Sequence, residues 1–218
     1  VAKAFGAGSL PAGYTEVEYL GFNGKTCIFT GVQPLHTDRI IIDADLNRDI
    51  PSGYIGTITT TTYSGSYWSL GLTNSSAFGW YWDGRTGYVA FNYNDKLLTG
   101  EIEQRNTYEL INGSFLINGS VKKTDPQSQS PSDGNGEWYI GDYNRDCAGG
   151  KYYRYTIKND TTGVLRFDGI PCLDQATGKY GMYDLVSNSF HGNRSPNADF
   201  TGGPAVVSLK KFVIEKEV

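Results

Sequence analysis

Apolar and polar residues alternate in short runs along most of this chain, the period-two pattern of a β-strand with one buried face. The clearest case is residues 39–46, where every even-numbered position is apolar and Asp43 and Asp45 fall between them. No segment has the 3.6-residue period of an amphipathic helix. Strands are predicted at residues 16–20, 26–30, 39–46, 54–62, 67–72, 78–82, 88–93, 108–111, 114–117, 121–123, 138–141, 152–158, 164–167 and 206–214.

Two Asn-Gly steps punctuate residues 108–121, at Asn112-Gly113 and Asn118-Gly119. Asn and Gly adopt the positive φ angles of two-residue hairpin turns more readily than other residues. This segment is therefore predicted to form a three-strand meander. The Asn-x-Ser triplets at these steps also fit the glycosylation pattern, but turn chemistry accounts for them.

The domain prediction separates residues 1–9, a leader or linker, from a single β-sandwich domain at 10–218. The first segment is rich in small residues and has no period. Residues 123–136 are polar and broken by prolines, which predicts a long surface loop, and strands of similar character lie on both sides of it. A length of 218 residues suits one all-β domain. Many short strands without helices indicate two packed antiparallel sheets.

One predicted hairpin, residues 78–93, joins two aromatic strands through a Gly-rich turn. Pairing Trp82 with Tyr88 separates its residues into two faces, because side chains alternate along a strand. One face collects Phe78, Trp80, Trp82, Tyr88, Ala90 and Asn92. The other, which is the better core face, collects Gly79, Tyr81, Val89, Phe91 and Tyr93.

The first of these faces has the chemistry of a sugar-binding surface. Sugars present flat C–H patches beside hydroxyl groups, so their sites combine aromatic rings with amide or carboxylate groups. The candidate ligand-binding residues are Trp80, Trp82, Tyr88 and Asn92, extended by Trp68, Asp83 and Arg85. The alternative is that these aromatic residues are buried for structural reasons, as large aromatic residues usually are.

Segments in the first and last parts of the chain resemble a known family. They are residues 10–20 (LPAGYTEVEYL), 138–142 (WYIGD), 152–157 (YYRYTI), 163–172 (GVLRFDGIPC), 181–190 (GMYDLVSNSF) and 200–204 (FTGGP). Their order is similar to that in the concanavalin A-like, laminin-G-like modules of bacterial surface proteins and phage tail proteins. The resemblance implies an antiparallel jelly-roll β-sandwich with a non-catalytic adhesion or carbohydrate-binding role, located outside the cell, at a cell surface or on a virion.

Charge and composition narrow the range of partners. The net charge is −4, which disfavours nucleic acid because phosphate binding needs clustered cations. No apolar run approaches the roughly 20 residues of a transmembrane helix, so membrane insertion is not expected. Cys27, Cys147 and Cys172 are odd in number and have no Cys-x-x-Cys spacing, which leaves free thiols or one disulfide plus a free thiol open.

No catalytic residue is assigned. Glucanases of this fold carry three alternating acidic residues, whereas the nearest set here is Asp43, Asp45 and Asn47. Asn47 cannot donate a proton as a carboxylic acid does, so the prediction is that the protein is not an enzyme.

A metal site is not predicted either. Asp142, Asn144 and Asp146 are spaced like the start of a calcium loop. However, Cys147 replaces the turn glycine and Tyr153 stands at the closing glutamate position. Calcium is therefore a weak candidate, and no other cofactor is expected.

The sequence thus predicts a carbohydrate-binding module whose partner is a cell-surface or plant glycan. A first alternative is a structural or protein-binding domain that meets other subunits of a virion or adhesin assembly. A second alternative is a glycoside hydrolase or lyase of the same fold.

Overall fold

The computed structural model describes residues 10–46, 56–61, 67–72, 77–82, 89–93, 104–111, 114–124, 136–141, 149–195 and 198–206. Strands and their connections make up all of these segments, with no helix among them, which confirms the all-β prediction. It follows that no helix in the described part of the chain has the length and apolar character needed to cross a membrane.

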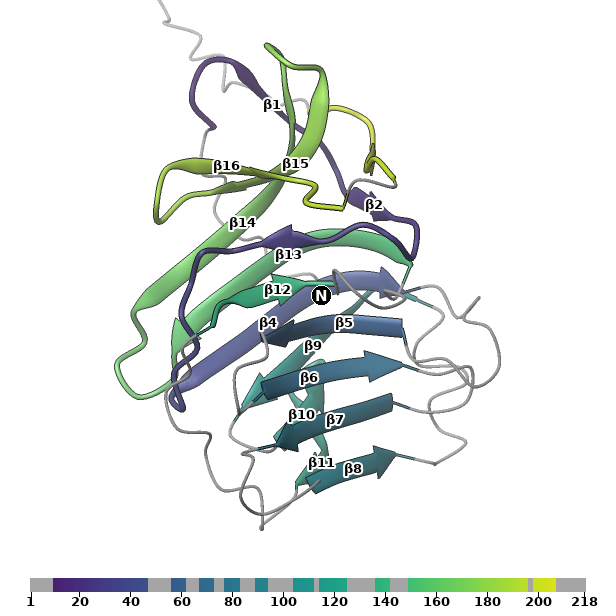
Figure 1. Cartoon of the computed structure of the whole chain (residues 1–218), viewed down its shortest axis with the longest axis vertical. Helices are drawn as coiled ribbons and strands as arrows, with labels where there is room; N and C mark the ends of the chain where they lie inside the picture. The colour runs from purple at the N-terminus through teal and green to yellow at the C-terminus, as the bar shows by residue number, and fades with distance from the viewer. Residues whose placement is uncertain are drawn as a thin grey trace, which may run out of the picture.

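Every strand pairing is antiparallel, and the strands form one large and one small sheet (Figure 1). The main path of the eleven-stranded sheet runs β11 (Ser120–Thr124), β10 (Ser114–Ile117), β9 (Asn106–Ile111), β4 (Asp38–Leu46), β13 (Gly150–Asn159), β14 (Leu165–Asp174), β15 (Lys179–Asp184) and β16 (Ser189–Gly192). Three short strands join it off this path: β1 (Tyr14–Glu16) pairs with β14, β2 (Leu20–Phe22) pairs with β13, and β17 (Thr201–Gly202) pairs with β2. The six-stranded sheet runs β3 (Ile28–Phe29), β12 (Trp138–Ile140), β5 (Gly56–Thr61), β6 (Tyr67–Leu72), β7 (Ala77–Trp82) and β8 (Val89–Tyr93).

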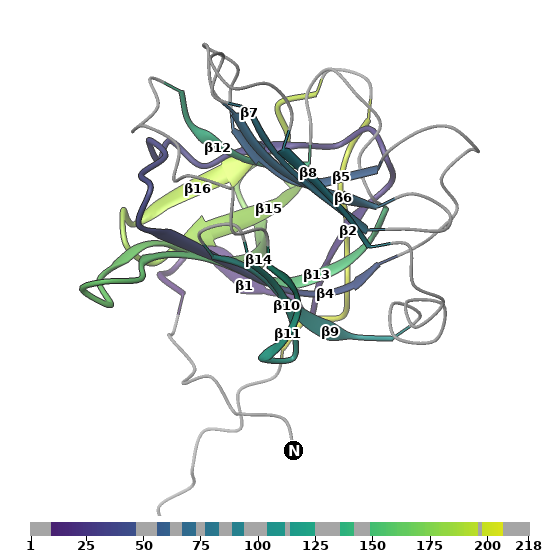
Figure 2. The ribbon, with the colours of Figure 1, turned by 90° about the horizontal axis from the view of Figure 1, so that it is seen from below.

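The two sheets form two layers around one core (Figure 2). A single cluster of buried residues draws on both, including Ile40 and Ile42 from β4 and Leu70, Trp138 and Ile140 from the smaller sheet. Burial of apolar surface between two sheets is the main stabilising term in such an arrangement. The arrangement is that of a β-sandwich, in agreement with the prediction at this level.

Strand β4 follows its sequence pattern closely. Ile40, Ile42 and Ala44 are fully buried and Leu46 nearly so, while the alternate positions are partly exposed. The strand starts at the buried Asp38, whose carboxylate accepts a hydrogen bond from the indole N–H of Trp138 at 2.8 Å. The period-two prediction for this strand is confirmed.

The meander is also confirmed, since β9, β10 and β11 pair in succession. Asn118 and Gly119 both have positive φ angles, 52° and 77°, as the Asn-Gly signal requires. The other predicted turn, Asn112-Gly113, lies outside the described residues.

Sequence patterns missed three strands, β15, β16 and β17. In β15 the last four residues, 181–184, are all buried, so both faces are covered and no alternation exists to detect. The predicted single strand at 16–20 is found as two, β1 and β2. The predicted strand at 206–214 lies, apart from Val206, outside the described residues.

Candidate functional site

Burial fixes which face of the six-stranded sheet meets the core. Ile28 pairs with Ile140, Ile140 with Thr59, and Thr59 with Leu70. Ile28, Ile140 and Leu70 all have 0% of their surface exposed. Because side chains alternate along each strand, positions in register with this row lie on the inner face, and the positions between them lie on the outer face.

The next row of paired positions crosses all six strands on the outer face. We call it the transverse row, and it consists of Phe29, Tyr139, Thr60, Ser69, Trp80 and Ala90. Four strand spacings separate its first member from Trp80, a distance of roughly 19 Å. The row thus has aromatic residues towards both ends and hydroxyl-bearing residues in the middle.

The predicted hairpin register agrees with the observed pairing. Phe78 pairs with Asn92, Trp80 with Ala90 and Tyr81 with Val89, the register predicted for these positions. Trp80 and Trp82 occupy outer positions, and so does Asn92. Of the other candidates, Asp83, Arg85 and Tyr88 lie outside the described residues.

Trp68 occupies a different position from the other candidates. It pairs with Tyr81, which alternates with Trp80 and Trp82, and it lies two residues from the buried Leu70. The register therefore separates Trp68 from the outer-face tryptophans, and we leave it out of the site.

The β3–β12 end of the transverse row has two stacked rings. The rings of Phe29 and Tyr139 are 4.1 Å apart between centroids, with an interplanar angle of 12°. Both residues are half-buried, unlike their fully buried neighbours Ile28 and Ile140. The Arg194 guanidinium carbon lies 5.4 Å from the centre of the Phe29 ring, within the range of a cation–π contact.

Sequence reasoning missed this end of the row. Its residues come from segments more than a hundred positions apart, and only strand pairing brings them together. One local signal was present: Tyr139 stands between two apolar residues that alternate with it, Trp138 and Ile140. That alternation marks Tyr139 as the outward position of its strand.

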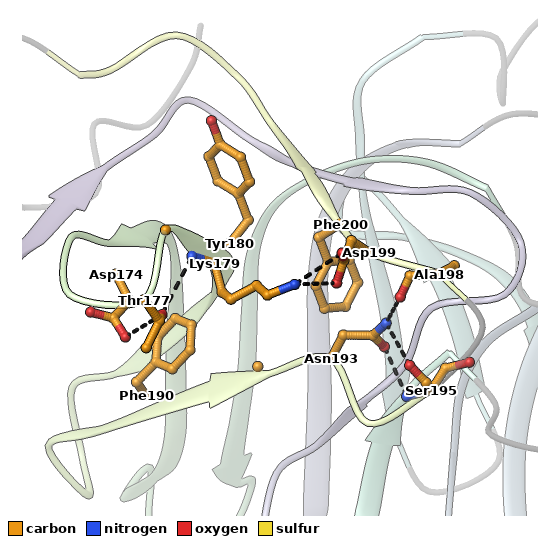
Figure 3. A pocket seen from close by; sticks show the side chains of 12 residues that line it. Asp174, Thr177, Lys179, Tyr180, Phe190, Asn193, Ser195, Ala198, Asp199 and Phe200 are labelled. Carbon is orange, nitrogen blue, oxygen red and sulfur yellow. Dashed lines mark hydrogen bonds and ion pairs between the residues drawn. The ribbon is translucent and has the colours of Figure 1, made fainter.

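A separate depression of about 1100 Å³ lies beside β15 and residues 193–195 and 198–200 (Figure 3). Lys179 extends across it to an ion pair with Asp199 at 3.0 Å. The Asn193 side-chain oxygen accepts hydrogen bonds from the backbone N–H groups of Cys27 and Ser195, both at 3.0 Å. The Thr177 hydroxyl, which donates to Asp174 at 2.7 Å, holds the pKa of that carboxyl below its usual value.

These polar groups are thus engaged with one another and fasten the loop to the sheet. The same depression contains the half-buried rings of Tyr180 and Phe190. The ring of Tyr180 packs closely on Gly202, where an added Cβ would lie 2.1 Å from a ring carbon. Because its polar groups and one of its rings already have partners within the protein, the depression is a weaker ligand-site candidate than the outer sheet face.

The acidic residues of β4 have a structural partner. Arg105 donates two hydrogen bonds to Asp43, at 2.8 and 2.6 Å, and its guanidinium lies 3.7 Å from the centre of the Tyr153 ring. The bond to Asp43 raises the pKa of Arg105. Asp43 is therefore held as a paired carboxylate, while Asn47 lies outside the described residues.

Metal ligands do not gather anywhere in the described segments: no group of three His, Cys, Asp or Glu side chains is placed to hold an ion there. The calcium candidates Asp142, Asn144 and Asp146 lie outside those segments. Cys27 and Cys172 are buried, and Cys147 is outside the described part as well.

Fold and site together define an all-β protein with two facing antiparallel sheets and an aromatic row on the outer face of the smaller one. In comparisons with known proteins, no protein-family model and no curated protein matches the chain.

Proposed function

We propose that this chain is a non-catalytic carbohydrate-binding module with a jelly-roll topology of the concanavalin A-like, laminin-G-like type. The observation that carries the proposal is the register of the six-stranded sheet, in which Trp80, Trp82 and Asn92 alternate with the positions in register with buried Leu70. Two tryptophans and an amide at outer positions are suited to a saccharide. In this proposal the rings stack on its C–H faces and the amide hydrogen-bonds its hydroxyls.

The proposed partner is a cell-surface or plant glycan, and the proposed location is extracellular, on a bacterial surface protein, a secreted enzyme or a phage tail. The family resemblance in the sequence supports this setting. A carbohydrate-cleaving role is less well supported, because Asp43, one of the two candidate acids on β4, is paired with Arg105. General acid–base chemistry needs a carboxyl group that can exchange its proton with the substrate.

The test is a glycan array followed by calorimetric titration with the best ligand. Trp80→Ala and Trp82→Ala should each weaken binding by roughly 30-fold, the effect of losing about 2 kcal/mol from a central aromatic contact. Tyr153→Ala is the matched control, since Tyr153 is a half-buried aromatic residue of the other sheet. Unchanged affinity in both tryptophan variants would contradict the proposal.

The first alternative is a structural or protein-binding domain. An outer face with several aromatic residues also suits a protein interface, where Trp and Tyr are enriched. Sedimentation equilibrium distinguishes the two functions. A defined oligomer that Trp80→Ala dissociates, together with no glycan binding, would favour the assembly role.

A further inference from the structure

Arg194 differs from the other arginines in the described part of the chain. Four of the five arginines described have a carboxylate partner, in the pairs Arg39–Glu109, Arg105–Asp43, Arg154–Asp168 and Arg166–Asp38. Arg194 forms no ion pair with any residue that the structure describes; its side chain lies over the Phe29 ring. The protein as a whole has a net charge of −4, so an arginine without an acidic partner is a distinct feature of its surface.

The backbone around Arg194 is held in place. The Arg194 N–H donates to the Cys27 carbonyl at 3.0 Å. The side-chain oxygen of the neighbouring Asn193 accepts hydrogen bonds from the backbone N–H groups of Cys27 and Ser195. The Phe29 carbonyl is in turn 2.9 Å from His191 Nδ1. These bonds connect the loop to the segment at β3, so the Arg194 backbone is held there and its exposed guanidinium lies over the Phe29 ring, at the β3 end of the transverse row.

An exposed guanidinium held over an aromatic ring is well suited to recognise a carboxylate. Its planar N–H groups match the two oxygens of a carboxylate, and a charge-assisted pair is about twice as strong as a neutral hydrogen bond. The Phe29 ring covers one side of the guanidinium and so reduces the screening of that charge by water. The site at this end therefore favours an anionic group.

We propose that the outer face of the six-stranded sheet binds an acidic oligosaccharide along the transverse row, with a sugar carboxylate at Arg194. This inference rests on the proposed function and specifies its substrate class. The oligosaccharide must be several sugars long, because roughly 19 Å separates the Phe29 position from Trp80. Thr60 and Ser69 occupy the middle of the row, where hydroxyl groups can pair with those of a saccharide.

The test compares two probes that differ in one group. One is a galacturonic acid hexamer, and the other is the same hexamer with its carboxyl groups methyl-esterified and therefore neutral. The folded protein should bind the acidic hexamer roughly tenfold more tightly, the factor that corresponds to one charge-assisted contact. This preference should shrink as the ionic strength rises.

Two variants assign the preference to its residue. Arg194→Gln should abolish the tenfold difference between the two hexamers. Lys151→Gln is the matched control. Lys151, in β13 of the larger sheet, is an exposed cation 4.9 Å from the centre of the Tyr19 ring, and its loss changes the net charge equally. Tyr139→Ala should weaken binding of the hexamer more than binding of a disaccharide, because only a long chain reaches both ends of the row.

Separate results overturn the inference and the function on which it rests. Equal affinity for both hexamers, or an undiminished preference in Arg194→Gln, overturns the acidic-oligosaccharide inference while leaving glycan binding at Trp80 intact. Binding of neutral glycans, with no binding of the acidic hexamer, would likewise overturn the acidic-oligosaccharide inference and leave the proposed function standing. If no glycan binds at all, on the array or in titrations with either hexamer, the proposed function fails and this inference fails with it.

Discussion

Leu70 of β6 pairs with Gly79 of β7, and the Leu70 side chain is completely buried. This one pair determines the orientation of both strands, because Ser69 and Trp80, the next residues in the register, must then lie on the outer face. The location proposed for glycan binding depends on this orientation.

Alanine substitutions at two neighbouring positions of β6 test this orientation directly. Leu70→Ala should lower the free energy of unfolding by about 2–5 kcal/mol, the range for a buried leucine, whereas Ser69→Ala should change it by less than about 0.5 kcal/mol. Urea denaturation followed by fluorescence measures both. A loss at Ser69→Ala as large as that at Leu70→Ala would contradict the assignment of these two positions to opposite faces.

The ion pair between Arg154 and Asp168 supports a second prediction. Two nearly parallel hydrogen bonds join them, at 2.7 and 2.6 Å, and Asp168 is only 5% exposed. Arg154→Met leaves a buried carboxylate without its main partner, so we expect a loss of about 3–5 kcal/mol in the free energy of unfolding. The double variant Arg154→Met/Asp168→Leu should recover much of this loss. A double variant less stable than the single one would show that the unpaired Asp168 carboxylate is not the cause of the loss.

Local signals in the sequence were sufficient where one face of a strand is buried and the other is not. The alternation in β4 and the Asn-Gly turn before β11 are of this kind, and both were predicted correctly. Local signals were insufficient where both faces of a strand are covered, as in β15. Pairing between distant segments is also invisible locally: nothing near Phe29 in the sequence indicates that Tyr139 stacks on it.

The candidate site was predictable to a similar extent. The hairpin register came from one turn and two aromatic strands, so the outer positions of Trp80 and Trp82 follow from local sequence. The inner position of Trp68 became evident only once Leu70, two residues along β6, was found to be fully buried. The position of Arg194 over Phe29 likewise depends on a loop that reaches β3 from the far end of the chain.

The turn between β10 and β11 gives a third prediction. Gly119 has a φ of 77°, which costs an L-residue with a Cβ roughly 1–2 kcal/mol. Gly119→Ala should therefore destabilise the protein by about that amount, measured by urea denaturation. Gly119→Asn should cost less, because asparagine tolerates this conformation better. Equal stability of the alanine variant and the parent protein would contradict the turn assignment.

Cys172 gives a prediction about pH. Burial, reinforced by the nearby charge of Asp174, raises the pKa of this thiol from its ordinary value near 9 to about 12. Between these two values the unfolded thiol loses its proton while the folded thiol keeps it. The unfolded state is therefore favoured as pH rises, and the free energy of unfolding should fall from pH 9 upward, with no loss from this group below that pH.

The expected loss from this thiol is about 2 kcal/mol between pH 9 and pH 10.5, since each unit of pKa difference corresponds to 1.36 kcal/mol. Urea denaturation of the parent protein and of Cys172→Ala across this range isolates the contribution, because other titrating groups affect both proteins alike. The alanine variant is less stable at pH 8 because it has a cavity, but its stability should decline less steeply with pH. Parallel pH profiles for the two proteins would show that the Cys172 thiol ionises as readily in the folded state as in the unfolded one.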